Sequence, residues 1–373
     1  MKIKSILALI LAGGILLSGC QAETTKTESD VSKQEVTSSE EATSEASNPE
    51  FDLAVDLTTV KRGVNLSALE DPFKYSKFLF EDDTYTNIAG KGFDHVRLPV
   101  DFRNYADKDG TLNDKKMQDV DGIIKAANEA GLVVFLDFHG WYNLNTSKGD
   151  DILFIKIWKN LAERYKNYEH NDMLIFELIN EPHTTEGSNL DMVTLSMLQG
   201  LTANAIRGIS PNRTICFATA DWNGSWTLKS DVANSYRNSV LMNYENVIVA
   251  VHTYATIEFT HQNMAWNGTQ GKFVKLDDTV LDELKKQLKD MMDFTVETGV
   301  PVILNEFGFN TDPNTIPYED QAKYVQTIMD VLGEHDVPWS WWAYCNGEFA
   351  IYKKTSMFGK YQWNDTLIDV MMK

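Results

Sequence analysis

The sequence predicts an α/β fold in which eight strand–helix units close into a (β/α)8 barrel. Short apolar runs recur eight times between residues 62 and 344, and stretches with helical periodicity separate them. The runs are apolar on both faces, as in parallel strands that helices cover. Eight such units in the 323 residues from 51 to 373 fit the length of a barrel with inserted loops.

The expected strands are rich in β-branched and aromatic residues, which favour extended structure. Each run is five to nine residues long, which suits a strand better than a helix. We expect strands at Arg62–Leu66, Phe93–Val100, Leu132–Phe138, Met173–Asn180, Thr214–Ala220, Asn246–Tyr254, Pro301–Phe307 and Trp339–Tyr344.

Three of the intervening stretches carry apolar residues every three or four positions, so each predicts a helix with one buried face. Each stretch is followed by glycine, which commonly ends a helix. We expect these helices at Lys115–Ala130 before Gly131, at Thr279–Thr298 before Gly299 and at Tyr318–Leu332 before Gly333. The alternative fold is a two-lobed α/β solute-binding protein, which also alternates strands and helices.

The first fifty residues are not expected to join this fold. Lys2 and Lys4 precede an apolar run of 12 residues, which is typical of an export signal and short for a membrane span. The run leads into Leu17-Ser18-Gly19-Cys20, which resembles the lipobox of bacterial lipoproteins. The resemblance implies export, lipidation of Cys20 and a catalytic domain held at the cell surface by that anchor alone. An ordinary signal peptide with an incidental cysteine is the alternative.

Residues 21–50 contain 19 Ser, Thr, Asp or Glu residues in 30 and no aromatic residue. Such a segment buries too little apolar surface to offset chain entropy, so we expect a disordered linker. The predicted organisation is a signal peptide at 1–20, a linker at 21–50 and one catalytic domain at 51–373.

The composition excludes several kinds of function. The chain has 54 acidic residues against 34 Lys and Arg, a formal net charge of −20, which argues against nucleic acid and against an anionic membrane surface as partners. Three cysteines are too few for a disulfide framework. Cys216 lies in the fifth expected strand and Cys345 just past the eighth, and these strands are not neighbours, so we expect two buried thiols. The chain has no glycine-rich phosphate motif, and its paired aspartates lack the spacing of a calcium loop, so we expect no cofactor and no metal.

Polar and aromatic residues gather at the carboxyl ends of six of the expected strands, where a barrel carries its active site. Two of them, Glu181 and Glu306, stand on opposite sides of the expected mouth. Cleavage of a glycoside needs a pair of carboxyl groups, one to protonate the leaving oxygen and one to attack or support the anomeric carbon. The alternative is that each acid ends its strand by pairing with Arg97.

The stretch Leu174–His183 (LIFELINEPH) resembles the signature of glycoside hydrolase family 5, the cellulase family A, and the resemblance extends from Arg62-Gly63-Val64-Asn65-Leu66 to Trp342. It implies that Glu181 is the acid/base and Glu306 the nucleophile of a retaining, double-displacement reaction. It also implies substrate-binding or positioning roles for Arg97, His139, Asn180, His252, Tyr254 and Trp342.

The two carboxyl groups need opposite protonation states. We expect Glu306, beside Arg97 and Tyr254, to stay anionic, and we expect the pKa of Glu181 to be raised so that it can donate a proton near neutral pH. A retaining mechanism also predicts that the two groups lie about 5–5.5 Å apart.

Aromatic residues in the expected loops are candidates for further sugar subsites, because indole and phenol rings stack on pyranose rings. Packing of the loops themselves is the alternative. These candidates are Trp141, Tyr142, Trp222, Trp226 and Trp266, with Asn143 and Asn223 as further candidates for hydrogen bonds to sugar hydroxyls. We assign no role to His261, and we expect His95, His170 and Trp158 to be structural.

The sequence therefore predicts a retaining endo-β-1,4-glucanase that acts as a monomer on β-linked polysaccharides or oligosaccharides. Within the family, β-mannanase, xyloglucanase and exo-β-glucosidase activities are the alternatives. A sugar-binding lipoprotein of a transporter is the alternative from another class. It explains the lipobox and the aromatic residues but not the opposed Glu181 and Glu306.

Overall fold

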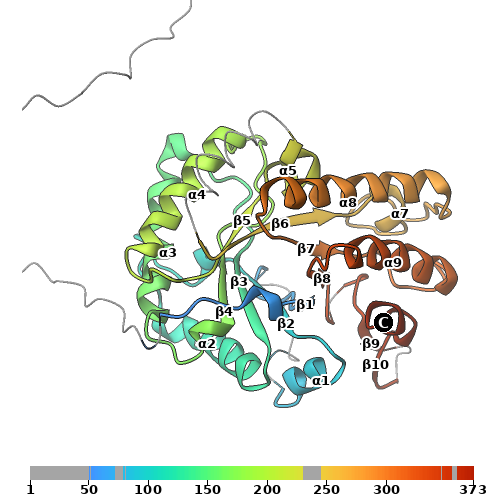
Figure 1. Ribbon diagram of the computed structural model, residues 1–373, viewed down its shortest axis with the longest axis horizontal. Helices are drawn as coiled ribbons and strands as arrows, with labels where there is room; N and C mark the ends of the chain where they lie inside the picture. Colours follow the sequence, from blue (N-terminus) through green and yellow to red (C-terminus); the bar gives the residue numbers. More distant parts are fainter. Residues whose placement is uncertain are drawn as a thin grey trace, which may run out of the picture. The chain divides into compact units, whose positions relative to one another are not determined.

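The computed structural model describes residues 50, 52–71, 79, 81–229, 245–345, 347–354 and 359–373. In this part of the chain, eight parallel strands close into one barrel in sequence order, and β8 pairs with β1 (Figure 1). The predicted (β/α)8 barrel is confirmed, and the two-lobed alternative is wrong because the sheet closes on itself. The predicted signal peptide with Cys20, and the linker up to residue 49, lie outside the described residues.

The strands begin and end within the predicted runs. Five of them are shorter at their carboxyl ends, so that Asn180, Tyr254 and Trp342 stand just beyond their strands, whereas Arg97, His252 and Glu306 lie within theirs. The strands are β1 Arg62–Asn65, β2 His95–Val100, β3 Val133–Phe138, β4 Leu174–Glu177, β5 Ile215–Ala218, β6 Val247–Thr253, β7 Val302–Phe307 and β8 Trp339–Trp341.

Helices surround the strands, with α3 and α4 along one side and α8 and α9 along the other in Figure 1. The helices of the described residues are α1 Thr84–Gly90, α2 Asp114–Glu129, α3 Asp150–Tyr165, α4 Met192–Arg207, α5 Ala220–Asn223, α7 Ile257–Thr260, α8 Asp278–Thr298, α9 Tyr318–Gly333 and α10 Asp365–Met371. Short 3-10 turns lie at η1 Leu57–Thr59, η3 Phe102–Asn104, η4 Thr146–Lys148, η5 Asn171–Met173 and η6 Ser225–Lys229.

The glycines predicted to end three helices behave differently from one another. Gly131 and Gly299 follow α2 and α8 in the left-handed region, with φ of 84° and 71°, as the sequence predicts. Gly333 instead remains the last residue of α9, and the helix ends at Glu334, whose N–H bonds the Leu332 carbonyl.

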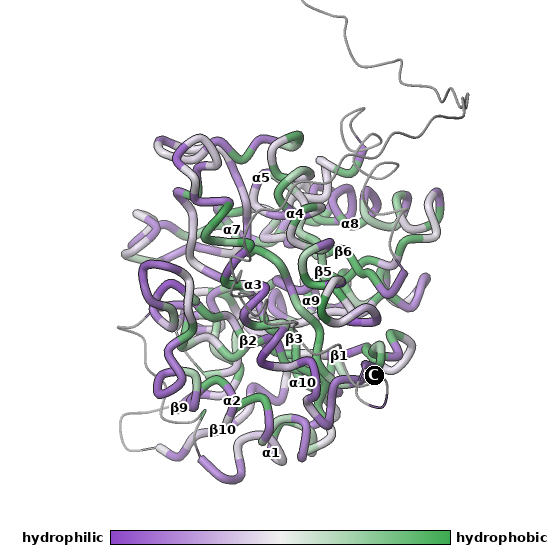
Figure 2. Tube along the Cα trace, turned by 90° about the vertical axis from the view of Figure 1, so that its left-hand side faces the viewer, coloured by the Kyte–Doolittle hydropathy of each residue, from purple (hydrophilic) through white to green (hydrophobic). Residues whose placement is uncertain are grey.

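The barrel has two hydrophobic layers because successive residues of a strand point to opposite faces. Outward residues pack under the helices, and inward residues such as Phe135, Cys216 and Ile303 form a second cluster inside the barrel. Figure 2 shows hydrophobic segments along the strands at the centre and hydrophilic segments at the periphery. Gly63 on β1 leaves the room that the buried His95 ring occupies, since a Cβ there would lie 2.1 Å from the ring.

The chain after β8 adds a hairpin of β9 (Tyr352–Lys354) and β10 (Tyr361–Trp363), followed by α10, which packs on α9. The apolar pattern of the sequence predicts neither the hairpin nor α10. Cys216 is buried, whereas Cys345 is partly exposed, so only one of the two thiols is buried as expected; neither forms a disulfide within the described residues. Among the described residues, no helix has both the length and the hydropathy needed to cross a membrane.

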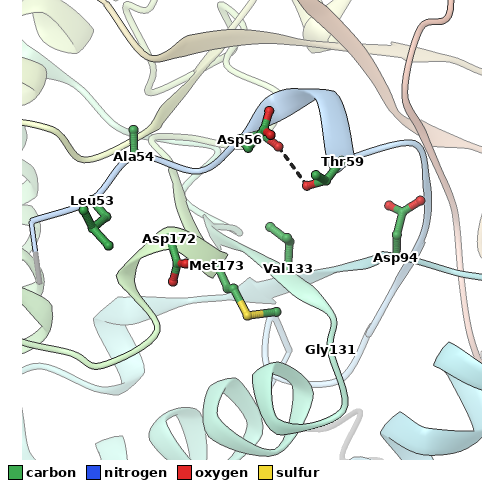
Figure 3. Close-up of a pocket in the computed structure, with 9 residues that line it drawn as sticks. All are labelled: Leu53, Ala54, Asp56, Thr59, Asp94, Gly131, Val133, Asp172 and Met173. Carbon is green, nitrogen blue, oxygen red and sulfur yellow. Dashed lines mark hydrogen bonds between the residues drawn. The ribbon is translucent and has the colours of Figure 1, made fainter.

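The two ends of the barrel differ in character. The amino-terminal end of the strands, the base, has a hollow of about 500 Å³ (Figure 3). It is lined by Leu53, Ala54, Asp56, Thr59, Asp94, Gly131, Val133, Asp172 and Met173. The predicted site residues lie at the opposite, carboxyl-terminal end, which we call the mouth.

Candidate active site

Arg97 is the centre of the site, and it is fully buried inside the mouth. Its guanidinium bonds both oxygens of Glu177 at 2.8 Å and reaches Asp137 at 2.9 Å. It also donates to Glu306 at 2.5 Å and to the side-chain oxygen of Asn180 at 2.8 Å. The neighbouring carboxylates raise the pKa of Arg97 well above its ordinary value despite its burial, so the residue is a permanent cation.

Glu306 lies near the end of β7 and points into the mouth. The pairing of β7 shifts register on both sides at this position, between Val251 and His252 of β6 and between Leu304 and Phe307 of β7 itself. Such irregularities re-aim a side chain. One oxygen of Glu306 accepts from Arg97, and the other accepts from the Tyr254 hydroxyl at 2.9 Å. The two donors predicted for this carboxylate are therefore both in place.

Glu181 stands four residues beyond β4 and faces Glu306 across the mouth. Its φ of 46° is left-handed, which is uncommon for a residue other than glycine and is typical of functional sites. Its Oε1 lies 3.0 Å from Nδ1 of His252, and its backbone oxygen lies 2.6 Å from Nδ1 of His183. The side chain is 18% exposed, against 5% for Glu306, so Glu181 is the carboxyl group nearer to solvent.

One carboxyl oxygen of Glu181, one of Glu306 and a ring nitrogen of His252 lie within 4.8 Å of one another. Three such atoms are close enough to hold a metal ion. However, both oxygens of Glu306 already accept hydrogen bonds, and Arg97 already supplies the compensating positive charge. The arrangement suits two carboxyl groups that act on one bond between them.

Burial dominates the electrostatics of the pair. It raises the pKa of Glu181 and also that of Glu306 above the ordinary value for glutamate. At Glu306, His252 and Arg97 oppose the effect of burial, and Glu181 adds to it. The raised pKa of Glu181 has the predicted direction. The pKa of Glu306 is raised as well, and the direct contact with Arg97 opposes that effect without reversing it, so the anionic state of Glu306 stays a prediction.

The other strand-end residues complete one wall of the mouth. Asn180 joins Arg97 to His139, with its Nδ2 3.2 Å from Nε2 of that ring. The His139 ring stacks on Trp342 with centroids 5.8 Å apart and planes at 17°. The structure thus brings together all eight of the strand-end residues predicted for the site. His139 has no hydrogen bond with Glu181 among the described contacts, so of the two imidazoles only His252 touches that carboxyl group.

Two buried acids of the site, Asp137 and Glu177, were missed by the sequence analysis. Asp137 binds Nδ1 of His139 at 2.8 Å and also pairs with Arg97, and Glu177 binds Arg97 through both oxygens. The signal was present, because a strand has a period of two residues. Asp137 lies two residues before His139, and Glu177 lies four before Glu181, so each faces the same interior as its partner.

Loop aromatic residues flank the site on two sides. Trp222 is 48% exposed and stacks on His183 with centroids 3.4 Å apart, and Tyr142 lies 6.3 Å from the same indole. These rings lie beside Glu181. On the side of Tyr254 and Glu306, the His261 ring lies between Tyr254 and the exposed Trp266, with centroid distances of 5.1 and 5.5 Å.

The remaining candidates divide between exposed and buried positions. Trp226 is 46% exposed and donates through its indole N–H to Asp221. The expectation that Trp141 belongs to an outer sugar subsite is corrected. Trp141 is 7% exposed and packs between Phe154 and the guanidinium of Arg103, so its environment is that of a loop-packing residue.

Of the three residues expected to be structural, Trp158 and His95 are buried in such positions. Trp158 is buried and bonds the Leu178 carbonyl, and His95 is held between Asp94 and Ser340. His170 is half-exposed beside Glu169, outside the site. Of the two asparagines considered for sugar contacts, Asn143 is exposed and Asn223 is fully buried behind His252.

Comparison with known proteins agrees with this geometry. Residues 57–348 match the family described as Cellulase (glycosyl hydrolase family 5). Endoglucanase 3 of Fibrobacter succinogenes is 24% identical over 74% of this chain and 48% of its own length, so the chain spans about half of that enzyme. Endoglucanase C of Acetivibrio thermocellus is 24% identical over 80% of this chain and 95% of its own length.

Solved structures share the fold. Thermotoga maritima Cel5A in complex with cellobiose superimposes with a TM-score of 0.71 at 25% identity, covering 87% of this chain and all of that chain. The same enzyme in complex with mannotriose gives a TM-score of 0.71 at 24% identity. The matched region contains the whole barrel and both opposed glutamates, and the chain belongs to glycosyl hydrolase family 5.

Proposed function

We propose that the chain is a retaining endo-β-1,4-glucanase. The observation that carries this proposal is the pair Glu181 and Glu306, which have carboxyl oxygens within 4.8 Å of each other and different hydrogen-bond partners. An inverting enzyme separates its carboxyl groups by about 6.5–9.5 Å to admit a water molecule, whereas a retaining enzyme keeps them at about 5–5.5 Å. The observed spacing favours the retaining mechanism.

In the proposed reaction, Glu181 protonates the glycosidic oxygen while Glu306 attacks the anomeric carbon and forms a glycosyl ester. The sugar–oxygen bond breaks, and the leaving chain departs with the proton. Glu181, now a carboxylate, then takes a proton from water, which attacks the ester and releases Glu306. Arg97 and Tyr254 stabilise Glu306 whenever it is anionic, and Trp342 supports the sugar ring from below.

The proposed substrate follows from the aromatic residues and the relatives. Because Glu181 protonates the leaving group, the leaving chain passes over the rings beside it, Trp222 and Tyr142. The retained chain lies toward Trp266, with Trp226 at the margin of the mouth. The matched relatives carry endoglucanase names, which favours β-1,4-glucan, while a Cel5A complex with mannotriose keeps mannan as the main alternative.

The decisive experiment compares substrates with the purified chain. New reducing ends are measured on carboxymethyl cellulose, barley glucan, mannan and xyloglucan, for the wild type, Glu181→Gln and Glu306→Ala. We expect cleavage of the glucans by the wild type alone, and the first-formed sugar anomer, followed by NMR, should be β. An α anomer would refute the retaining mechanism. Oligosaccharide binding without cleavage in all three proteins would favour the sugar-binding lipoprotein instead.

We also propose that the enzyme is exported, anchored through a lipid on Cys20 and monomeric, on the basis of the lipobox-like Leu17-Ser18-Gly19-Cys20. Labelling cells with a palmitate probe should mark the wild type and leave Cys20→Ala unlabelled, and light scattering on the detergent-solubilised chain should give the mass of one copy. Equal labelling of both proteins would contradict the anchor.

A further inference from the structure

A strained turn lies directly behind the mouth, between β5 and β6. Asp221, Trp222 and Asn223 have φ values of 53°, 65° and 55°, so three consecutive residues other than glycine are left-handed. Single left-handed residues are tolerated at Asn and Asp, but a run that includes tryptophan persists only when its surroundings impose it.

The surroundings of this turn impose that conformation through β6. The backbone of Gly224 forms an isolated bridge with His252, the residue that touches Glu181. A side chain at Gly224 would meet the Trp226 ring at 2.4 Å, so glycine leaves the room that this ring occupies. The indole of Trp226 in turn bonds the carboxylate of Asp221 at 2.9 Å and closes the turn.

As a result, two adjacent side chains of the turn differ in their surroundings. Trp222 is half-exposed on the rim of the mouth, whereas Asn223 is fully buried. Its Nδ2 lies 3.5 Å from Nε2 of His252, and its Oδ1 has no hydrogen-bond partner among the described residues. A buried amide with a single polar neighbour normally has a reason to be there.

A role for the buried Asn223 amide follows from which ring nitrogen of His252 carries the proton. Burial lowers the pKa of His252 to about 4, so the ring is neutral at working pH and carries one proton. When Nε2 accepts from Asn223, that proton must be on Nδ1, which faces Oε1 of Glu181 at 3.0 Å. Oε1 is then held as an acceptor, and the proton that Glu181 donates to the substrate sits on its other oxygen.

We propose that Asn223 is a positioning residue that fixes the tautomer of His252 and thereby orients the acid/base Glu181. The proposal rests on the proposed function, in which Glu181 protonates the leaving group. Besides Glu181, the charged or titratable groups that act on His252 are Glu306, Arg97, Glu177 and His139. Those that act on Glu181 are His139, Arg97, His183 and Glu306.

The test separates the protonation step from the rest of the reaction. Asn223→Gly removes the amide and suits the left-handed backbone. Its kcat/KM is measured on a cellobioside with an unactivated alcohol as leaving group and on 2,4-dinitrophenyl β-cellobioside, whose leaving group departs without a proton. General acid catalysis contributes about 10²–10⁴-fold, and we expect Asn223→Gly to lose about tenfold on the first substrate and less than about twofold on the second.

The matched control is Asn246→Gly. Asn246 is also left-handed, with φ of 53°, but it precedes β6 at the base of the barrel, and we expect no change on either substrate. Losing the N–H donated to Oε1 raises the pKa of Glu181, so the alkaline limb of the kcat/KM profile should move to higher pH in Asn223→Gly. Asn223→Asp, which keeps the shape of the side chain, should move it in the same direction.

Equal losses on both substrates, or an unmoved alkaline limb in both Asn223 variants, would overturn this proposal. The proposed function would survive that outcome as long as the wild type cleaves both substrates. If instead the wild type cleaves neither, the proposed function itself fails, so the two failures are distinguishable.

Discussion

The mouth and the base of the barrel each bury an arginine, and the two are held in opposite ways. Arg97 at the mouth has three carboxylates around it, from Asp137, Glu177 and Glu306. Arg213 at the base has no salt bridge among the described residues. It donates to the backbone carbonyls of Asn171, Leu174 and Tyr165 at 3.3, 2.9 and 3.2 Å and lies over the Phe176 ring.

This difference indicates that the arginine at the mouth serves the reaction, whereas the arginine at the base serves the stability of the fold. The carboxylates around Arg97 repel one another. This repulsion is an unfavourable electrostatic energy, and it falls when one carboxylate loses its charge during a reaction. At the base, an arginine fixes carbonyl groups that flank β4 and have no ladder partner there. Burial lowers the pKa of Arg213 to about 9, whereas the carboxylates around Arg97 raise its pKa.

The largest difference between the effect on activity and the effect on stability is expected for Glu306→Ala. If Glu306 is the covalent nucleophile that we propose, its removal should lower kcat by roughly 10⁵–10⁶-fold, as in other enzymes with covalent intermediates. The free energy of unfolding should change by no more than about 1 kcal/mol, because the loss of one ion pair is offset by relief of repulsion among the carboxylates. Reducing-sugar assays and urea unfolding measure the two quantities. A large loss of stability would mean that the mouth, too, is a structural ion cluster.

The next largest effect is expected for Arg97→Lys. Lysine keeps the positive charge, but it cannot bond both oxygens of Glu177 and also reach Glu306 and Asn180. By comparison with the loss of a preorganised donor in other active sites, kcat should fall by about 10²–10³-fold. The acid limb of the pH–rate profile should also move to higher pH, because Glu306 loses its closest cation. Arg213→Lys is the matched control, and its activity should equal that of the wild type.

The sequence was sufficient for the mouth in outline. Eight apolar runs predicted the barrel, and the polar residues at their ends predicted where the site lies, because parallel strands bring their carboxyl ends together. The resemblance to glycoside hydrolase family 5 then selected the eight residues that the structure brings together there. Asp137 and Glu177 were missed because each lies within a predicted apolar run; the structure places them at the carboxyl ends of the shorter strands β3 and β4.

The sequence could not predict the exposure or the orientation of side chains that depend on tertiary contacts. Trp141 and Trp222 are both loop tryptophans, yet one packs beside Phe154 and the other stacks in the open on His183. Nothing in their local sequences distinguishes them. The register shifts that aim Glu306 and the left-handed turn that buries Asn223 also depend on partners distant in the chain.

At the base, Arg213→Met should lower stability and leave catalysis intact. Methionine fills part of the same space but leaves buried carbonyls, such as that of Leu174, without a donor. Each unsatisfied group costs about 1–3 kcal/mol, so we expect the free energy of unfolding to fall by about 2–4 kcal/mol. Below the unfolding transition, kcat and KM should equal those of the wild type. A loss of activity in folded protein would show that the two ends of the barrel are coupled.

The smallest effect is the pH dependence of stability that the mouth imposes. Burial raises the pKa of Asp137 from 3.8 to about 7, so between these values the folded chain holds a proton that the unfolded chain has released. Stability is then greatest at acidic pH and falls as the pH rises toward 7. The pKa of about 7 already includes the opposing effect of Arg97, and at 1.36 kcal/mol per pKa unit it corresponds to a fall of about 2 kcal/mol between pH 5 and pH 7.

Asp137→Asn cannot ionise, so thermal unfolding across this range should show a flatter pH dependence for the variant than for the wild type. Some slope should remain, because burial also raises the pKa values of Glu177, Glu181 and Glu306. Arg213→Met should keep the full slope of the wild type at a lower overall stability, because it leaves the acids of the mouth unchanged. Parallel curves for the wild type and Asp137→Asn would mean that Asp137 is already ionised at pH 5.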